Sequence, residues 1–225
     1  NTHRQHFLLS DREHVPHPAL DIDEAGALLT VREQPDYEPV IIPRERWEFA
    51  RVVSGRVIPD KNYVHLVEGF ESGLIYQLTY TTSGSPILGL GFLAMRDSIS
   101  LLRHESLSDP NLRDLDINYT YAWGSSQSGR FLRTFLNLDL NLDECGREVL
   151  DGVVPHVAGG MRGEFNQRFG QPSKDLPSVI AQLFPFTDVE SMDTDNEKSG
   201  ALLSRILARN SGIKVCFTNT SAEYW

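Results

Sequence analysis

The stretch from Tyr119 to Arg130 constrains the fold more than any other part of the chain. It begins with alternating aromatic and small residues, a pattern typical of a buried strand, and then makes a tight glycine–serine turn. An amphipathic helix is predicted directly after the turn, with an apolar stripe formed by Phe131, Leu132, Phe135 and Leu136. A serine between a strand and a helix, with a glycine two residues before it, is the sequence form of a nucleophile elbow.

Ser126 is the candidate nucleophile of this turn. The backbone at such a position is strained, so its neighbours must be small, and Gly124, Ser128 and Gly129 meet that need. A serine hydroxyl is a weak nucleophile that requires a base and a site for the oxyanion. The backbone N–H of Gln127, at the start of the helix, is the expected oxyanion-hole donor. The alternative is a polar turn in which Ser126 only caps the helix.

Strands alternate with helices from residue 74 onward, which predicts a layered α/β fold with a largely parallel sheet. Shorter strand-like runs separated by prolines precede it. Residues 1–24 are a polar lead segment, and we expect one domain over residues 25–225. Because the chain starts without methionine and stops at Trp225 directly after a strand-like run, we expect it to be a segment of a longer protein.

The charge balance of the 225-residue chain limits its partners. A formal net charge of -10 disfavours nucleic acid and anionic membranes, and no apolar run is long enough to span a bilayer. Two cysteines leave the compartment undecided, and Cys216, in an apolar run, is expected to be a small core residue. The oligomeric state is not indicated by the sequence.

Two histidine pairs have a spacing that could indicate a metal. They are His3 with His6 and His14 with His17. Prolines at 16 and 18 prevent the helix that would place the second pair on one face, and no cysteine lies nearby. We therefore expect an exposed lead segment and no metal.

A glycine pattern at Gly89, Gly91 and Ala94 outlines a dinucleotide-binding fingerprint, with Asp114 and Asp116 about twenty residues on. In that fingerprint the glycines follow the first strand of a βαβ unit, and here only a few apolar residues precede them. The competing interpretation is close packing where a loop enters the next helix. A dehydrogenase that uses this turn is thus the weaker alternative, and we expect no cofactor.

Together these segments resemble the α/β-hydrolase superfamily and, more closely, the bacterial family of alpha/beta hydrolase domain-containing proteins. The matching stretches are Gly69–Tyr76, Gly89–Asp97, Trp123–Phe131, His156–Gly163, Asn166–Phe169 and Thr218–Trp225. They cover most of residues 40–225 in the family's order. The turn also resembles that of glucuronoyl esterases, but Arg130 and Gln127 stand where those enzymes carry lysine and arginine, so the resemblance does not extend to glucuronoyl ester specificity.

The resemblance implies an α/β-hydrolase fold, with a mostly parallel sheet flanked by helices after a β-rich N-terminal lead. Since the chain stops early, we expect this fold to lack its last strand and helix. The implied activity is that of a serine hydrolase acting on a small carboxylic ester without a cofactor. The alternative is a non-catalytic binding or scaffold domain that retains the hydrolase fold, because the expected late histidine is not in the sequence.

The resemblance also assigns roles to individual residues. Ser126 is the nucleophile, and Glu223, in the loop after a late strand, takes the place of the acid, although an exposed loop carboxylate is the simpler interpretation. The base is expected beyond Trp225. His156, at the end of the strand after the helix, is the one substitute within the chain, although a structural or substrate-contacting role suits it better.

Three further residues lie in the loop beside His156 and could bind substrate. They are Arg162, Asn166 and Arg168. Their side chains could orient an acid or a polar substrate, or brace the loop through ion pairs.

Overall fold

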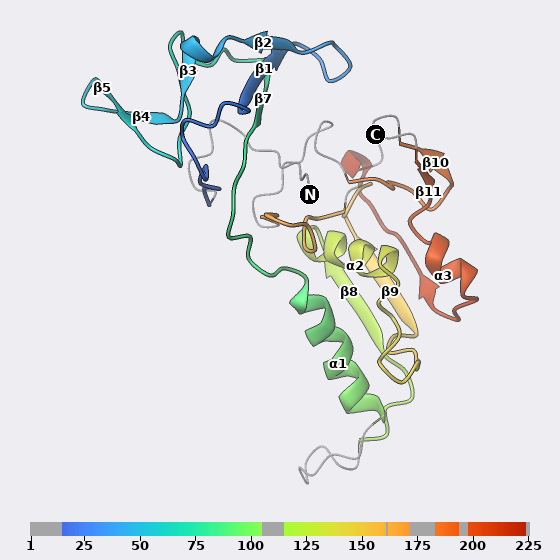
Figure 1. The fold of residues 1–225 in the computed structure, drawn as a ribbon. Coiled ribbons are helices and arrows are strands. Elements are labelled where there is room, and N and C mark those ends of the chain that lie inside the picture. Colours follow the sequence, from blue (N-terminus) through green and yellow to red (C-terminus); the bar gives the residue numbers. More distant parts are fainter. Residues whose placement is uncertain (1–14, 105–114, 161, 172–182, 194–197, 224–225) are drawn as a thin grey trace. The chain divides into compact units, whose positions relative to one another are not determined.

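The computed structural model describes residues 15–104, 115–160, 162–171, 183–193 and 198–223 (Figure 1). The chain divides between Pro86 and Ile87 into two compact units. The predicted lead segment 1–24 and single hydrolase domain 25–225 stay predictions. His3, His6, His14 and Asp114 lie outside the described residues.

The unit that ends at Pro86 is built from short antiparallel strands. Its strands are β1 (Leu28–Arg32), β2 (Val40–Ile42), β3 (Trp47–Glu48), β4 (Ala50–Val53), β5 (Arg56–Pro59), β6 (His65–Leu66) and β7 (Ile75–Thr79). β1 pairs with β2 and β7, β3 pairs with β6, and β4 pairs with β5. A short 3-10 turn, η1 (Arg44–Arg46), precedes β3. This arrangement agrees with the β-rich N-terminal region expected from the sequence.

The unit that begins at Ile87 is a small parallel sheet with helices. Its strands are β8 (Tyr121–Ser125), β9 (Gly152–His156), β10 (Ser191–Met192), β11 (Ser199–Gly200) and β12 (Lys214–Val215). Its helices are α1 (Leu90–His104), α2 (Gln127–Asn137), α3 (Ser204–Ala208) and the 3-10 turn η3 (Ser221–Glu223). β9 lies between β8 and β12 and pairs with both in parallel, so that the carboxyl ends of the three strands meet at one edge. β10 and β11 form a separate antiparallel pair.

The core of this unit lies between α2 and the sheet. Leu132, Phe135 and Leu136 of α2 are buried, as the sequence predicted, and pack in one cluster with Val153 of β9. Phe92 of α1 stacks on Phe131 with ring centroids 4.3 Å apart. These contacts fix α2, and with it the turn that precedes it, against β8 and β9.

The turn that enters α1 is packed closely. Gly89 has a φ of +94°, which residues with a side chain rarely adopt, and a Cβ there would lie 2.4 Å from Oδ1 of Asn166. No strand directly precedes Gly89, because residues 83–89 have no regular structure. Since the dinucleotide fingerprint requires such a strand, this geometry favours the close-packing interpretation.

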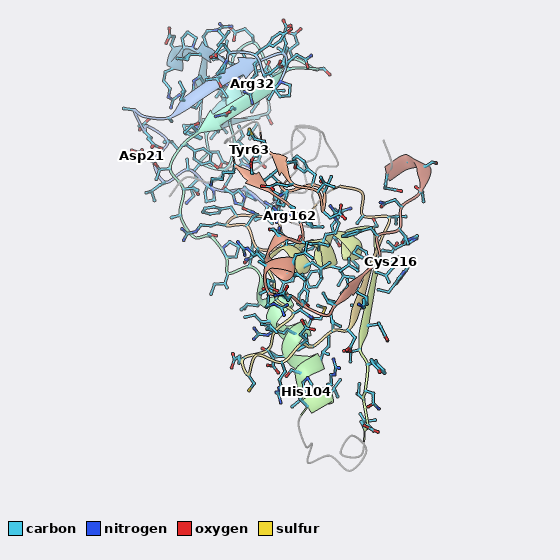
Figure 2. All side chains as sticks on the ribbon, turned by 90° about the vertical axis from the view of Figure 1, so that its right-hand side faces the viewer. Asp21, Arg32, Tyr63, His104, Arg162 and Cys216 are labelled. Atoms are coloured by element: carbon cyan, nitrogen blue, oxygen red, sulfur yellow. The ribbon has the colours of Figure 1, made fainter. Side chains whose placement is uncertain are left out.

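Two expectations from the sequence are wrong, and both concern the face of the sheet opposite α1 and α2. The strand at 119–123 was expected to be buried, but Tyr119, Tyr121 and Trp123 are 69%, 71% and 67% exposed. Cys216 was expected in the core and is exposed. Side chains alternate along a strand, and within this unit Figure 2 shows α1 and α2 on one face of the sheet and Cys216 toward the other. The hydrophobic pattern alone could not reveal that the described helices cover only one face.

Asp143 organises the loop between α2 and β9. Its carboxylate is only 8% exposed and accepts hydrogen bonds from the Ser100 hydroxyl (2.6 Å) and from Nε of Arg147 (2.8 Å). The backbone N–H groups of Arg147 and Cys145 donate to its other oxygen. The bond from Ser100, together with those from Arg147 and Cys145, holds the pKa of Asp143 well below its usual range, although burial acts in the opposite direction.

We expect Asp143→Asn to lower the free energy of unfolding at neutral pH. Because folding lowers the pKa of Asp143, its contribution is fully present above the unfolded pKa of about 3.9 and is lost as the pH falls through the folded value. The difference between wild type and variant should therefore be constant near pH 7 and shrink below about pH 4. Urea unfolding at several pH values measures it. Glu144→Gln, at an exposed neighbouring carboxylate, is the control, and equal stability of Asp143→Asn and wild type at pH 7 would contradict the prediction.

Candidate active site

Ser126 occupies a strained backbone position between β8 and α2. Its φ is +52° and its ψ is -115°, values that a residue with a side chain adopts only when its surroundings enforce them. Its N–H donates to the carbonyl oxygen of His156 (2.9 Å), and its own carbonyl accepts from the N–H of Arg130 (2.9 Å). Ser126 is the N-cap residue of α2, but its side chain is exposed and makes no capping hydrogen bond to the helix.

The conformation of Ser126 depends on two glycines that let α2 approach β8 and β9 closely. A Cβ on Gly124 would lie 2.6 Å from the carbonyl oxygen of Ser128 and 2.9 Å from Leu132. A Cβ on Gly129 would lie 2.8 Å from the carbonyl oxygen of His156. Both glycines are buried, and the atoms they meet include backbone oxygens that cannot move without shifting a helix or a strand. The small residues predicted around Ser126 are thus required by the contact of α2 with β8 and β9.

Gln127 is the first residue of α2, and its side chain is exposed. The N–H groups of a first helical turn lack partners within the helix and carry the positive end of its dipole. An anionic oxygen that forms beside Ser126 would therefore meet a favourable field there. The oxyanion-hole role of Gln127 stays a prediction.

His156 lies at the carboxyl end of β9, opposite Ser125 in the parallel register. Its Nδ1 lies 2.9 Å from Oγ1 of Thr218, and its ring stacks on Trp123 with centroids 5.7 Å apart. In the described part of the chain the imidazole makes no hydrogen bond to the Ser126 hydroxyl. The main chain of His156 thus contacts the main chain of Ser126, while its side chain is held by two other residues.

Glu223 ends η3 and lies beside the loop that follows β9. Its Cβ and Cγ are each 3.7 Å from the place where a Cβ on Gly159 would be. One carboxylate oxygen accepts from the backbone N–H of Thr220 (2.8 Å) and from the Thr220 hydroxyl. These two bonds are the main causes that lower the pKa of Glu223, and the positive charge of a protonated His156 adds to them. Glu223 therefore closes its own turn and lies within electrostatic reach of His156.

Hydrogen bonds tie the loops after β9 and β12 to each other. The N–H of Val157 donates to the carbonyl of Thr218 (2.7 Å), and the N–H of Gly159 donates to Oδ1 of Asn219 (3.2 Å). These contacts place Glu223 and His156 at the edge of the sheet where Ser126 lies. Thr218 and Asn219 belong to the resembling stretch at 218–225, but no pattern in the sequence indicates their contacts.

The three residues of the loop beside His156 have different surroundings. Arg162, labelled in Figure 2, is half-buried and donates to the carbonyl of Phe184. Burial, and then the charges of Arg133 and Arg205, lower the pKa of Arg162 to about 10. Asn166 packs on Gly89, and Arg168 is exposed. Within the described residues no hydrogen bond or ion pair from these side chains to Ser126 or His156 is observed, and substrate binding by them stays a prediction.

Arg133 was not identified from the sequence. It lies in α2 and is only 4% exposed, which is rare for an arginine. It donates to the carbonyls of Gly160 and Phe186, and its guanidinium lies 5.1 Å from the ring centroid of Phe217. Burial lowers its pKa to about 10. No residue pattern in the sequence distinguishes this arginine from a surface one.

The described residues contain no group of three or more histidine, cysteine, aspartate or glutamate side chains arranged to hold a metal ion. In the same part of the chain, no helix has the length and apolar character needed to cross a membrane.

Comparison with known proteins identifies one family. The sequence model of the family described as "Alpha/beta hydrolase domain" matches residues 63–212. The match includes Ser126 and His156 and ends before Glu223. No curated protein and no solved structure matches the chain.

We expect Gly129→Ala to lower the free energy of unfolding by about 1–3 kcal/mol, because the added methyl group would force α2 away from the end of β9. Thermal or urea unfolding measures this. Gly91→Ala is the matched control: it also lies early in a helix, but a Cβ there would meet only Phe131 at 4.0 Å. That control should be neutral or slightly stabilising, since alanine favours helices. Equal effects of the two substitutions would contradict the argument.

Proposed function

This chain belongs to the alpha/beta hydrolase domain family, and from that premise we propose that it is a serine hydrolase that cleaves carboxylic esters. Membership by itself suggests hydrolysis in general. The narrower proposal is supported by one observation above all, the positive φ of an exposed serine at the junction of β8 and α2. Backbone strain of this kind is characteristic of functional residues, and the strand–serine–helix order is that of the nucleophile elbow.

In the proposed reaction, Oγ of Ser126 attacks the ester carbonyl and an acyl-enzyme forms with loss of the alcohol. The N–H of Gln127 donates to the oxyanion of each tetrahedral intermediate, with support from the dipole of α2. Water then attacks the acyl group and releases the acid. The reaction requires a base that removes the proton of Ser126 and returns it to the leaving alcohol.

The acid and the base of the reaction are also proposed from the family's order of residues. Glu223 orients the base and stabilises its charged form. The base itself is a histidine that follows Glu223 in the full-length protein. His156 is the substitute within this chain, but the contacts of its Nδ1 with Thr218 and of its ring with Trp123 support a different role.

Ser126→Ala in the full-length protein should reduce hydrolysis of p-nitrophenyl esters by at least about a thousandfold, because no other group can form the acyl-enzyme. A fluorophosphonate probe, followed by mass spectrometry, should label Ser126 in the wild type and nothing in the variant. Ser128→Ala is the control, since Ser128 is an exposed serine in the first turn of α2, and it should keep both labelling and turnover. Unchanged turnover in Ser126→Ala would overturn the proposal, and absence of labelling in folded wild-type protein would favour a scaffold domain.

Glu223→Gln should lower kcat by at least about a hundredfold while leaving the fold intact. Glutamine retains an oxygen that can accept from the N–H of Thr220, so the turn is kept, but it loses the charge that stabilises the protonated base. Steady-state kinetics and circular dichroism measure the two effects. Glu190→Gln, at an exposed acid, is the control. Full activity of Glu223→Gln beside an inactive Ser126→Ala would show that the acid lies elsewhere.

A further inference from the structure

The imidazole of His156 lies at the edge of the sheet beside the Ser126 turn and is held by contacts with Thr218 and Trp123. We propose that His156 is a hydrogen-bond donor to the bound substrate through Nε2, and that Thr218 is a positioning residue that fixes this tautomer. The inference rests on the proposed function, since it assigns a substrate contact within the same site. It assigns to His156 a role other than that of general base.

The main chain places His156 next to the nucleophile. The register between β8 and β9 sets it opposite Ser125, and its carbonyl oxygen accepts the N–H of Ser126 (2.9 Å). A side chain on the last residue of β9 therefore lies at the same end of the sheet as the Ser126 hydroxyl. A substrate held for attack by Ser126 would occupy this edge, where ligands of open α/β sheets bind.

The hydroxyl of Thr218 determines which nitrogen of His156 carries the proton. Oγ1 lies 2.9 Å from Nδ1, and a hydroxyl can donate or accept in such a contact. Within the described residues, Oγ1 of Thr218 has no other acceptor for its proton. Donation from Thr218 to Nδ1 satisfies both groups, whereas donation in the reverse direction leaves the hydroxyl proton without a protein acceptor. Nδ1 is therefore the acceptor, and in the neutral ring the proton is on Nε2.

The ring is held in this orientation from two sides. Trp123 stacks on it with an interplanar angle of 25°, and a parallel bridge joins His156 to Thr218. The main chain of Thr218 is fixed as well, because its N–H donates to the carbonyl of Pro155 (3.2 Å) and its carbonyl accepts from Val157 (2.7 Å). A flip of the ring would lose the bond from Thr218.

Nε2 is thus the nitrogen of His156 that can donate a hydrogen bond to a substrate. In the described part of the chain it has no hydrogen-bond partner, and the side chain is only half-buried. A base must present an unprotonated nitrogen to the serine hydroxyl, while this tautomer presents an N–H. Such a group suits an oxygen acceptor on the substrate, namely an oxygen of the bound ester.

The side-chain amide of glutamine places an N–H close to the position of Nε2 and cannot act as a base. We therefore expect His156→Ala to lose roughly tenfold or more in kcat/KM, the effect of one lost hydrogen bond, and His156→Gln to recover a clear part of that loss. If His156→Gln is as inactive as His156→Ala, or if His156→Ala has wild-type kcat/KM, the proposal is overturned. Labelling of Ser126 by the fluorophosphonate probe in each variant reports separately on the proposed serine chemistry.

A second measurement does not depend on turnover or on substitution of His156. Nitrogen-15 shifts of the imidazole, recorded above the pH at which the ring is charged, distinguish the two neutral tautomers. Wild-type protein should show the proton on Nε2, and Thr218→Val, which keeps the shape and removes the hydroxyl, should shift the population toward Nδ1. A proton on Nδ1 in the wild type, or the same tautomer in both proteins, would overturn the proposal. Failure of the proposed function would appear instead as unchanged turnover in Ser126→Ala.

Discussion

The close contact of α2 with the ends of β8 and β9 is the constraint on which the candidate site depends. Gly124 and Gly129 each leave no room for a Cβ, and between them Ser126 is forced into a positive φ. The strain of that conformation is offset by the burial of the apolar stripe of α2, which includes Phe135 and Leu136, both fully buried. The packing of α2 against the strands therefore also produces the strained, exposed position of Ser126.

A second arrangement joins the ends of β9 and β12. The bonds from Val157 to Thr218 and from Gly159 to Asn219 hold two loops whose residues are about sixty positions apart in sequence. Through them, the position of Glu223 depends on the same parallel ladder that places His156. Loops at the carboxyl ends of neighbouring strands commonly carry functional groups because a rigid sheet positions them. Here Ser126 follows β8, His156 ends β9 and Glu223 lies in the loop after β12, and these three strands are neighbours in the sheet.

Local features of this structure were predictable from the sequence, while pairings across the sheet were not. The stripe of α2 follows from helical spacing, and the small neighbours of Ser126 follow from the turn. The exposure of Tyr121 and Cys216 was missed because a strand pattern does not say which face another element covers. The contact of His156 with Thr218 joins two residues 62 positions apart and depends on how the chain after β12 pairs with the end of β9, and no local pattern encodes it.

Arg133 and Arg162 are two arginines whose hydrogen bonds go to backbone carbonyls. Arg133 and Arg162 remain charged at neutral pH, since a pKa of about 10 is well above it. Burial of two neighbouring cations is costly unless their N–H groups are satisfied. Arg133 donates to the backbone carbonyls of Gly160 and Phe186, and Arg162 donates to that of Phe184, whereas Nε of Arg162 has no partner among the described residues. The pKa of Glu223 is lowered mainly by its hydrogen bonds from Thr220, and neither arginine contributes to that shift. The two guanidinium groups thus hold backbone segments near the edge of the sheet. The chemistry proposed at that edge depends instead on Ser126, His156 and Glu223.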